Sequence, residues 1–312
     1  MLELSPFAAL PRPKILIVDD TPANLVAMRR LLARVDAELV TAGSGNEALA
    51  ACLQQEFALI LLDVQMPDMD GFEVATLLLE HQGEQATPII FVTAAYKDDL
   101  ARMHGYAVGA VDYIPKPVDE FVLLSKVKVF LDLYRGKQAL RQAEALARHQ
   151  ATHDALTDLP NRLLFMERLR SGLERARRED RLLALIYVDI DRFKPVNDQH
   201  GHAAGDALLK AIARRLRGLF RAVDTVARLG GDEFAVILQG LTDAREARQL
   251  ARAIEERIGQ SFEIASETTG GMVTVEIGAS TGIALYPGDA DSLESLIRVA
   301  DAAMYRHKRD RR

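Results

Sequence analysis

Apolar runs and helical segments alternate along the first part of the chain. Short apolar runs predict strands at 14–18, 38–41, 58–62, 88–92 and 111–114. Segments with helical spacing lie between them and after them, at 22–34, 45–55, 71–82, 97–108 and from 119 onward. This order predicts a doubly wound α/β domain, with a parallel five-stranded sheet covered by helices on both faces. The ligand site of such a sheet lies beyond the carboxyl ends of its strands.

The pattern changes after residue 153. Helices are expected at 163–178, 203–220, 243–259 and 292–308. Strands are expected at 182–189, on both sides of Gly230-Gly231, and at 273–277 and 280–285. The Gly-Gly-Asp sequence between two apolar runs indicates a hairpin with a tight turn. The βαββαβ order predicts an α+β domain whose sheet contains antiparallel strands and carries its helices on one face.

A long helical stretch separates the two patterns. From Asp119 to about His153 it has no proline and one glycine, and it is rich in Ala, Gln, Arg and Glu. An apolar seam with alternating spacing of four and three runs through Val129, Leu133, Gly136, Leu140, Ala143 and Ala147. The seam fits a solvated connector or a modest parallel coiled coil, and we favour the coiled coil. The expected organisation is a flexible lead-in at 1–13, one domain at 14–134, a linker at 135–153 and a second domain at 154–312.

Composition narrows the class of protein. The 312 residues are 49% apolar and 27% charged, which is typical of globular domains. The net charge of −6 argues against nucleic acid as a partner. Cys52 is the only cysteine, so no disulfide can form within the chain and a cytoplasmic location is expected. No apolar run is long enough to span a bilayer and the start does not resemble a signal peptide, so no membrane insertion is expected.

Polar side chains follow several strands of the first predicted sheet. Asp19 and Asp20 follow the first strand, and Asp63, Thr93 and Lys116 follow the third, fourth and fifth. Any one of the Asp or Thr residues could simply cap the next helix. All five at one edge of a sheet fit a site better, because three crowded carboxylates imply a divalent cation. A hydroxyl and an ammonium group opposite them would suit an added phosphoryl group.

A second acidic cluster is predicted in the second domain. Asp189 and Asp191 follow the apolar run at 182–188, and Asp232 and Glu233 lie at the tip of the hairpin. Carboxylates at a strand end and at a hairpin tip can converge on Mg²⁺. Such a metal, held by one or two carboxylates plus substrate phosphates, is the usual arrangement of a nucleotide site.

The first domain resembles the receiver domain of bacterial response regulators over about residues 14–134. The matching motifs are Val18-Asp19-Asp20, Leu62-Asp63-Val-Gln-Met-Pro67 with Asp70-Gly71, Val92-Thr93-Ala94 and Lys116-Pro117. The resemblance implies that Asp63 accepts phosphate from a histidine kinase. It implies Mg²⁺ held by Asp19, Asp20, Asp63 and the carbonyl of Gln65. Thr93 and Lys116 would grip the phosphoryl oxygens, and Tyr113 matches an aromatic switch position or is half-buried strand packing.

The second domain resembles the GGDEF domain of diguanylate cyclases over nearly its whole length. The matching motifs are Asp158-Leu-Pro-Asn-Arg162, Asp189-Ile-Asp-Arg-Phe-Lys194, Asn197-Asp198, Gly201-His202, Gly205-Asp206, Arg228-Leu-Gly-Gly-Asp-Glu-Phe234, and Ala300-Asp301 with Tyr305 and Lys308. The resemblance implies an α+β fold with a nucleotide-cyclase-like core. It implies a Mg²⁺-dependent (or Mn²⁺-dependent) enzyme that condenses two GTP into cyclic di-GMP.

The resemblance also implies residue roles. Asp189, Asp232 and the carbonyl of Ile190 would bind the metal, and either Asp232 or Glu233 would take the 3′-OH proton. Asn197 and Asp206 would read guanine, although Asn197 alone would suit a simple turn. His202 would line the substrate site and Lys194 would stabilise transferring charge. Lys308 and Arg312 would contact phosphate, or belong to a solvated basic tail in which Arg311 stands where the family often has glycine.

A further motif, Arg221-Ala-Val-Asp224, is separated from Gly230 by five residues. It matches the family's RxxD site, which binds the cyclic dinucleotide product and inhibits the enzyme. Arg252 matches a second arginine of that site. An ion pair at a helix end is the simpler alternative, but the position of the motif favours the inhibitory site.

The sequence therefore predicts a phosphorylation-regulated diguanylate cyclase that acts as a homodimer. The dimer is expected because the product has two-fold symmetry while each domain holds one GTP. A non-catalytic nucleotide receptor, a cyclase with relaxed base choice and a signalling scaffold are the rival interpretations. The intact acidic motifs argue against the receptor, and Asp206 argues against relaxed base choice.

Overall fold

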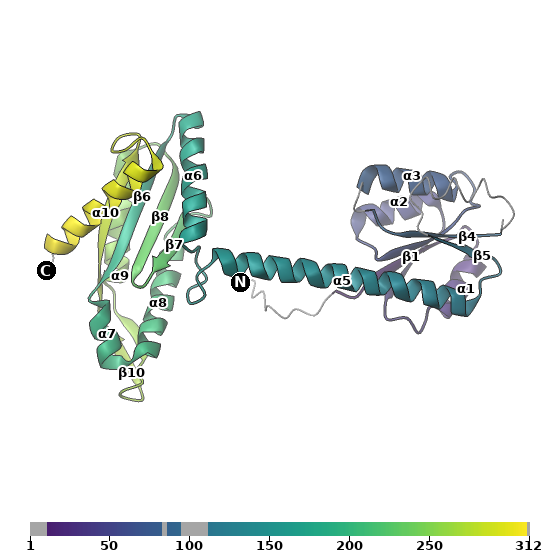
Figure 1. Cartoon of the computed structure of the whole chain (residues 1–312), viewed down its shortest axis with the longest axis horizontal. Helices are drawn as coiled ribbons and strands as arrows, with labels where there is room; N and C mark the ends of the chain where they lie inside the picture. Colours follow the sequence, from purple (N-terminus) through teal and green to yellow (C-terminus); the bar gives the residue numbers. More distant parts are fainter. Residues whose placement is uncertain (1–10, 83–85, 95–111, 311–312) are drawn as a thin grey trace. The chain divides into compact units, whose positions relative to one another are not determined.

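The computed structural model describes residues 11–82, 86–94 and 112–310. The chain divides into two compact units, Met1–Ala145 and Leu146–Arg312 (Figure 1). Part of the lead-in expected at 1–13, the helix expected at 97–108 and Arg312 lie outside the described residues.

The first unit contains a parallel five-stranded sheet. Its strands are β1 (Lys14–Val18), β2 (Glu38–Ala42), β3 (Leu59–Asp63), β4 (Ile89–Thr93) and β5 (Asp112–Pro115). They lie in the order β2-β1-β3-β4-β5. All four neighbouring pairs are parallel. The predicted parallel sheet is confirmed.

Helices cover both faces of this sheet. The described helices of the unit are α1 (Pro22–Leu31), α2 (Gly45–Gln54), α3 (Gly71–Gln82) and the part of α5 (Glu120–Thr152) up to Ala145. Alternate residues of β1 face opposite ways, as a strand requires. Ile15 and Ile17 pack in one core with side chains of α1 and α5. Leu16 and Val18 pack in the other with side chains of α2 and α3. Because both faces of the sheet are covered, side chains on both sides of each strand are buried, and the strands are therefore almost continuously apolar.

Helix α5 continues well beyond the core of the first unit. Its buried residues are Leu123, Val127 and Leu131. Of the predicted seam, Val129 is 55% exposed, Leu133 62% and Leu140 60%. The seam is thus exposed in the single chain. The predicted continuous helix is confirmed, because α5 runs without a break to Thr152. The coiled coil stays a prediction, because a single chain cannot test it.

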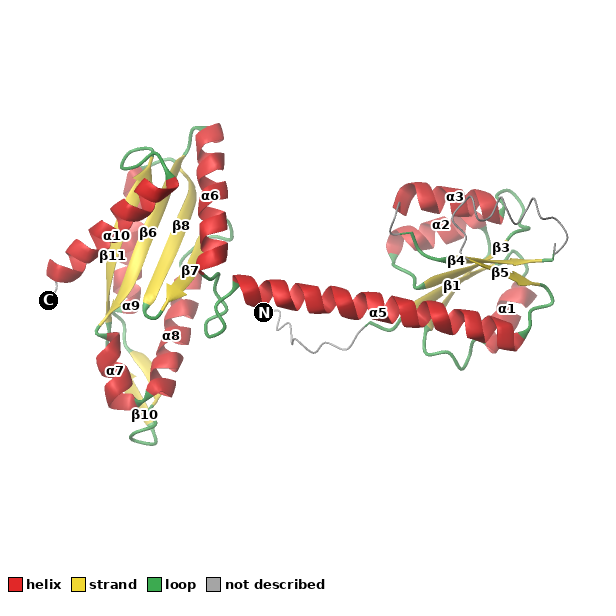
Figure 2. Ribbon diagram, viewed as in Figure 1, coloured by secondary structure: helices red, strands yellow, loops and turns green. Residues whose placement is uncertain are grey.

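The second unit is built on a four-stranded antiparallel sheet in the order β11-β6-β8-β7 (Figure 2). The described elements, in chain order, are α6 (Arg162–Glu179), β6 (Leu182–Asp191), α7 (Phe193–His200), α8 (His202–Arg217), β7 (Thr225–Gly230), β8 (Glu233–Leu241), α9 (Ala244–Ile258), β9 (Phe262–Ala265), β10 (Met272–Val275), β11 (Gly278–Tyr286) and α10 (Leu293–Asp310). Strands β9 and β10 form a separate two-stranded ribbon.

The expectation that helices cover one face of this sheet is wrong. On one face, even-numbered residues of β6 such as Ile186 pack with α8 and α9. On the other, odd-numbered residues such as Leu185 pack with α6 and α10. Figure 2 shows the sheet between these two helical layers. The physical reason is visible in β6, where every residue from 183 to 190 is buried. A strand without polar alternation must be covered on both faces.

Two short elements of this unit were not predicted. Helix α7 lies where the sequence predicts a loop. Pro195 and Asn197-Asp198 favour turns, which explains why the pattern does not indicate a helix. Pro195 is tolerated because it lies in the first turn, where its missing N–H has no helical acceptor. Strand β9 is only four residues long and gains its pairing from β10.

Helix α10 lies unusually close to strand β11. A Cβ atom placed on Gly282 of β11 would lie 2.2 Å from the Ala300 carbonyl oxygen and 2.2 Å from the Met304 amide nitrogen. Only glycine permits this approach, because both atoms belong to the helix backbone. The contact sets the height of α10 above the sheet, and α10 carries Lys308.

Among the described residues, we find no helix with the length and apolar character needed to cross a bilayer.

Candidate functional site

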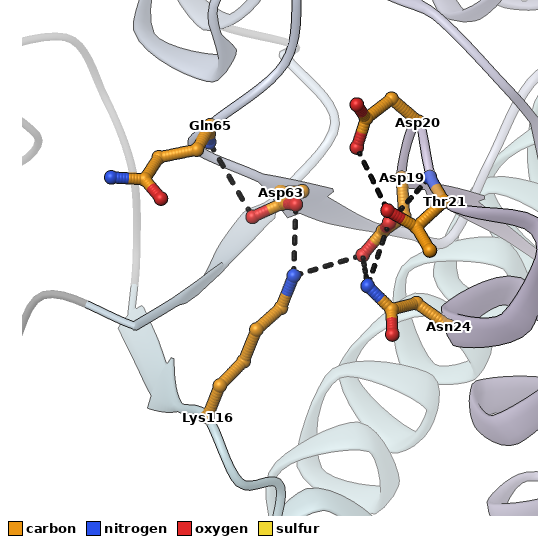
Figure 3. A network of polar contacts seen from close by, with 7 residues as sticks. All are labelled: Asp19, Asp20, Thr21, Asn24, Asp63, Gln65 and Lys116. Carbon is orange, nitrogen blue, oxygen red and sulfur yellow. Dashed lines mark hydrogen bonds and ion pairs between the residues drawn. The ribbon is translucent and has the colours of Figure 1, made fainter.

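The first site lies at the carboxyl edge of the parallel sheet. Asp19 and Asp20 follow β1, and Asp63 ends β3. One carboxylate oxygen from each residue lies within 4.8 Å of the others (Figure 3). Asp19 and Asp63 are buried, whereas Asp20 is exposed. The structure thus brings together the three carboxylates that the sequence places at strand ends, and oxygen donors at this spacing fit Mg²⁺.

Lys116 enters this cluster from the end of β5. Its Nζ lies 2.9 Å from Asp19 Oδ2 and 2.8 Å from Asp63 Oδ2. Asn24 of α1 donates two further hydrogen bonds to Asp19, at 2.9 and 3.0 Å. Sequence reasoning missed Asn24, whose signal is its position in the first turn of the helix that follows Asp19. Lys116 supplies a positive charge beside the buried Asp19 carboxylate, and the Asn24 amide supplies hydrogen bonds to it.

Burial dominates the electrostatics of the phosphoacceptor candidate. It raises the pKa of Asp63, and the hydrogen bond and charge of Lys116 only partly offset that effect. For Lys116, burial acts to lower the pKa, but hydrogen bonds to Asp63 and Asp19 outweigh it and raise the pKa overall. The ammonium group therefore stays charged beside a carboxyl group that is costly to ionise.

The other predicted residues of this site lie around Asp63. The Gln65 amide donates to Asp63 Oδ1 at 3.4 Å, so the Gln65 backbone adjoins the carboxylate. Thr93 ends β4 and is half-buried. The Tyr113 ring of β5 lies 5.5 Å from the Phe91 ring, centroid to centroid. Tyr113 is half-buried and packs on its neighbouring strand, and its role as an aromatic switch stays a prediction.

The second site lies at the end of β6 and the tip of the β7–β8 hairpin. Asp189 pairs with Glu233 of β8 across the sheet. The Ile190 amide donates to the Asp232 carbonyl at 3.1 Å. The sheet register therefore places both acidic residues of the hairpin beside the end of β6. A cavity of about 690 Å³ opens there, and its lining includes Ile190, Asp191, Lys194, Asp232, Glu276 and Lys308.

Lys308 reaches the site from α10. Its Nζ donates to Asp189 Oδ1 at 2.5 Å, although the two residues are 119 positions apart. Burial raises the pKa of Asp189, with Lys308 acting in the opposite direction and the charges of Asp232 and Asp191 adding to the rise. Asp189 is thus a buried carboxylate with other acidic residues nearby, and a positive charge such as that of Lys308 stabilises its ionised form.

Arg228 holds the hairpin tip in place. Its guanidinium group donates to the Gly231 carbonyl at 2.8 and 3.1 Å and to both Asp154 oxygens at 2.9 and 3.1 Å. The Arg228 amide also donates to the Pro160 carbonyl at 3.0 Å. The sequence analysis names Arg228 as a motif residue but does not predict its pairing with Asp154. A charged pair spaced 74 residues apart gives no local signal in one sequence.

The end of α5 is tied to this region through Asn161. Its side chain caps α6, accepting from the Leu163 and Leu164 amides, and also donates to the Ala151 carbonyl in the last turn of α5. The Asn161 amide donates to the Thr152 carbonyl at 2.9 Å. One residue therefore joins the end of one helix to the start of the next.

The predicted base-reading residues lie on α7 and α8. Asn197 of α7 faces Gly205 of α8, where an added Cβ would lie 1.8 Å from Asn197 Oδ1. His202 begins α8 and Asp206 lies one turn further, and both are exposed. Gly205 makes this close approach of Asn197 to α8 possible, at the residue that precedes Asp206 in the helix.

The residues of the predicted inhibitory site lie in the turn after α8. Arg221 and Asp224 line a separate cavity of about 310 Å³ bounded by β8 and α9. Arg252 lies on the exposed side of α9 and is not part of that lining.

The two folds and their acidic sites define a class of protein. A doubly wound unit with three clustered carboxylates and a lysine is joined to an α+β unit with an acidic cavity at a Gly-Gly hairpin. The comparisons agree with this division. The family model "Diguanylate cyclase, GGDEF domain" matches residues 151–312, and "Response regulator receiver domain" matches residues 15–128. The chain belongs to the GGDEF family and carries an N-terminal receiver domain.

Individual relatives share one or both units. The chain is 45% identical over 183 residues to the diguanylate cyclase TpbB of Pseudomonas aeruginosa, covering 58% of this chain and 41% of the relative. It is 28% identical over 304 residues to the response regulator PleD of Caulobacter vibrioides, covering 95% of this chain and 63% of the relative. The chain thus spans less than two thirds of either relative.

A solved structure supports the same fold. The coiled coil and GGDEF domain of DgcB from Caulobacter crescentus, in complex with c-di-GMP, is 28% identical with a TM-score of 0.54. The match covers 60% of this chain and 96% of that one.

Proposed function

We propose that this protein is a response-regulator diguanylate cyclase that condenses two GTP into cyclic di-GMP and two pyrophosphates. The observation that carries the proposal is the cavity at the end of β6, which is lined by Asp232, Lys194 and Lys308. Asp189, which pairs with Glu233 across the sheet, is bonded to the same Lys308. Acidic groups that can bind a divalent cation, beside basic groups that can bind phosphate, suit phosphoryl transfer.

The donor set at this cavity fits Mg²⁺ or Mn²⁺. Asp189 and Asp232 supply carboxylates, and Ile190 supplies a backbone carbonyl at the end of the same strand. Hard cations prefer such oxygen ligands. When bound, the metal would neutralise the triphosphate and polarise the α-phosphate.

The remaining groups of the site have separate tasks. Lys194 and Lys308 line the space that a triphosphate would fill, so both can offset its negative charge. Asp232 or Glu233 accepts the proton of the 3′-OH. Asn197 and Asp206 select guanine, because the Asp206 carboxylate accepts from guanine N1–H and N2–H₂, whereas adenine offers an acceptor at N1. His202 borders the same substrate, and Arg312 adds a further phosphate contact from outside the described residues.

Catalysis requires two copies of the chain. Each second unit holds one GTP, and each 3′-OH attacks the α-phosphate of the other GTP, so two such units must face each other. A homodimer joined through the exposed seam of α5 would supply this pairing. Val129, Leu133 and Leu140 are apolar, exposed and spaced for a parallel coiled coil.

The receiver domain regulates this encounter. A histidine kinase phosphorylates Asp63. Asp19, Asp20, Asp63 and the Gln65 carbonyl would hold the Mg²⁺ that offsets the charge of the phosphoryl group. Lys116, already 2.8 Å from Asp63, and Thr93 then contact the phosphoryl oxygens, and Tyr113 responds to that change. Phosphorylation shifts the population toward the paired, active arrangement. The product inhibits the enzyme at Arg221, Asp224 and Arg252.

The test of this function is GTP turnover by the full chain with Mg²⁺, with and without beryllofluoride as a mimic of the phosphoryl group. Cyclic di-GMP, identified by chromatography, should form faster with the mimic. GTP binding without product in either condition would favour a nucleotide receptor. Absence of both would leave a signalling scaffold.

Replacing Asp63 by asparagine should abolish the response to the mimic. The amide cannot accept the phosphoryl group and removes one of the three clustered carboxylates. We expect the accelerated rate to fall to the basal rate, measured as initial cyclic di-GMP formation. Asp180→Asn is the matched control, because Asp180 is exposed in a left-handed conformation that asparagine tolerates. An intact response in the Asp63 variant would contradict its role as phosphoacceptor.

Replacing Gly205 by alanine should weaken GTP binding. The new methyl group would lie 1.8 Å from Asn197 Oδ1, so the Asn197 amide must rotate away. We expect KM for GTP to rise about tenfold, as for the loss of one hydrogen bond to the base, with a smaller change in kcat. Gly218→Ala is the control, because its Cβ would make only ordinary contacts at 3.6 Å. An unchanged KM would argue that Asn197 does not contact the base.

A further inference from the structure

Arg221 is already paired with a carboxylate in this structure. Its Nη2 lies 2.9 Å from Oε1 of Glu246, in the first turn of α9. The Arg221 side chain is 73% exposed and that of Glu246 is 32% exposed. A ligand that approaches Arg221 from solvent therefore meets an arginine whose charge is partly neutralised by its own protein.

Asp224, the other residue of the motif, is held differently. Its Oδ2 accepts from the Arg221 amide at 3.2 Å and its Oδ1 from the Gln239 amide at 3.2 Å. The Gln239 side chain donates to the Val223 carbonyl at 3.1 Å. These bonds fix the backbone of the turn. The Arg221 side chain is thus free to change partner while Asp224 stays in place.

Glu246 belongs to the same cavity as both motif residues. The cavity of about 310 Å³ is lined by Arg221, Asp224, Glu246 and Gln249, with apolar walls from the turn after α8, from β8 and from α9. A phosphate drawn to Arg221 would approach the Glu246 carboxylate. Like charges at this separation repel, and the existing pair must also be broken.

The position of Glu246 keeps its carboxylate there. The residue follows Asp243, the N-cap of α9, by three positions, and its amide donates to the Asp243 carbonyl at 3.1 Å. A negative charge in the first turn of a helix is favoured by the helix dipole. Glu246 therefore has a structural contribution of its own, which a test must separate from any effect on ligands.

We propose that Glu246 is an internal competitor for Arg221 that weakens inhibition by the cyclic dinucleotide product. The proposal rests on the product inhibition included in the proposed function and concerns the concentration at which it acts. By occupying Arg221 and repelling phosphate, Glu246 raises the product concentration needed to fill the site. The enzyme then continues to run at product levels that would otherwise stop it.

The test compares inhibition by added cyclic di-GMP in the wild-type chain and in Glu246→Gln. Glutamine keeps the shape and removes the charge. The interaction free energies of an exposed ion pair and of one nearby like charge are each modest. We therefore expect the half-inhibitory concentration of Glu246→Gln to be about 5- to 20-fold lower than that of the wild type. Each variant is measured against its own uninhibited rate, and equilibrium binding of cyclic di-GMP should tighten by a similar factor.

Three further variants make the result specific. Glu256→Gln makes the same charge change at an exposed position of α9 outside the cavity and should inhibit like the wild type. Glu246→Ala removes the carboxylate by a different route and should also tighten inhibition, which guards against a folding defect in one variant. Arg221→Ala should lose binding at this site.

The outcomes separate the inference from the proposed function. Equal inhibition of wild type and Glu246→Gln, with loss in Arg221→Ala, would overturn the role of Glu246 and leave product inhibition in place. Weaker inhibition in Glu246→Gln would show that Glu246 helps to bind the product, which also overturns the inference. Identical inhibition in all three would remove both the inference and the inhibitory site, while leaving GTP turnover untouched.

Discussion

Replacing Asp189 by asparagine should reduce cyclic di-GMP formation by about 1,000-fold, the size of effect seen when a central electrostatic group is removed from an active site. Asp189 is the buried carboxylate at the end of β6, adjacent to Glu233 across the sheet and bonded to Lys308. An amide carries no charge to hold a divalent cation. The measurement is initial GTP turnover at saturating Mg²⁺.

Folding should survive this substitution. Burial raises the pKa of Asp189, which means that the folded protein disfavours its charge, so a neutral isostere relieves that cost. Lys308 loses its partner but is 25% exposed and can be hydrated. We therefore expect a melting temperature close to that of the wild type. Asp180→Asn controls for the chemical change, and normal turnover in Asp189→Asn would exclude Asp189 as a metal ligand.

Replacing Gly282 by alanine should destabilise the second unit by about 3 kcal/mol, near the upper end of what overpacking usually costs. The added methyl group would lie 2.2 Å from two backbone atoms of α10, so the whole helix must shift. Because domains have a total stability of about 5–15 kcal/mol, this is a large fraction. The melting temperature of the second unit should fall by about 6–12 °C.

Gly288→Ala is the control for the Gly282 substitution. No atom lies within 4 Å of a Cβ built on Gly288, so this change should leave the melting temperature nearly unaltered. A melting temperature of Gly282→Ala within about 1 °C of the wild type would contradict the close contact between α10 and β11.

The strands of the first unit could be predicted because the sequence features that determine them are local. Each strand is a short apolar run, and each polar site residue directly follows its strand. Parallel topology then brings Asp19, Asp63 and Lys116 together without further information. Asn24 could not be assigned in the same way, because its contact with Asp19 depends on the angle at which α1 leaves the sheet.

The second unit was harder to predict because its determinants are long-range. The uninterrupted apolar run of β6 already implied two covered faces, but the order of elements suggested one. Helix α7 was obscured by Pro195, which is harmless only in a first turn. The contacts of Lys308 with Asp189 and of Arg221 with Glu246 join different elements, so sequence position alone gives neither partner.

The burial of β6 from residue 183 to residue 190 has a consequence for how the protein can be controlled. A strand covered on both faces and paired on both edges opens only when the whole unit unfolds, so its amides should be among the slowest to exchange with deuterium. Asp189 lies on that strand and shares its rigidity. A signal that arrives from elsewhere in the chain therefore cannot act by making β6, the strand that carries Asp189, more flexible. Such a signal must instead change which surfaces of two copies of the chain come into contact, and how often they do so.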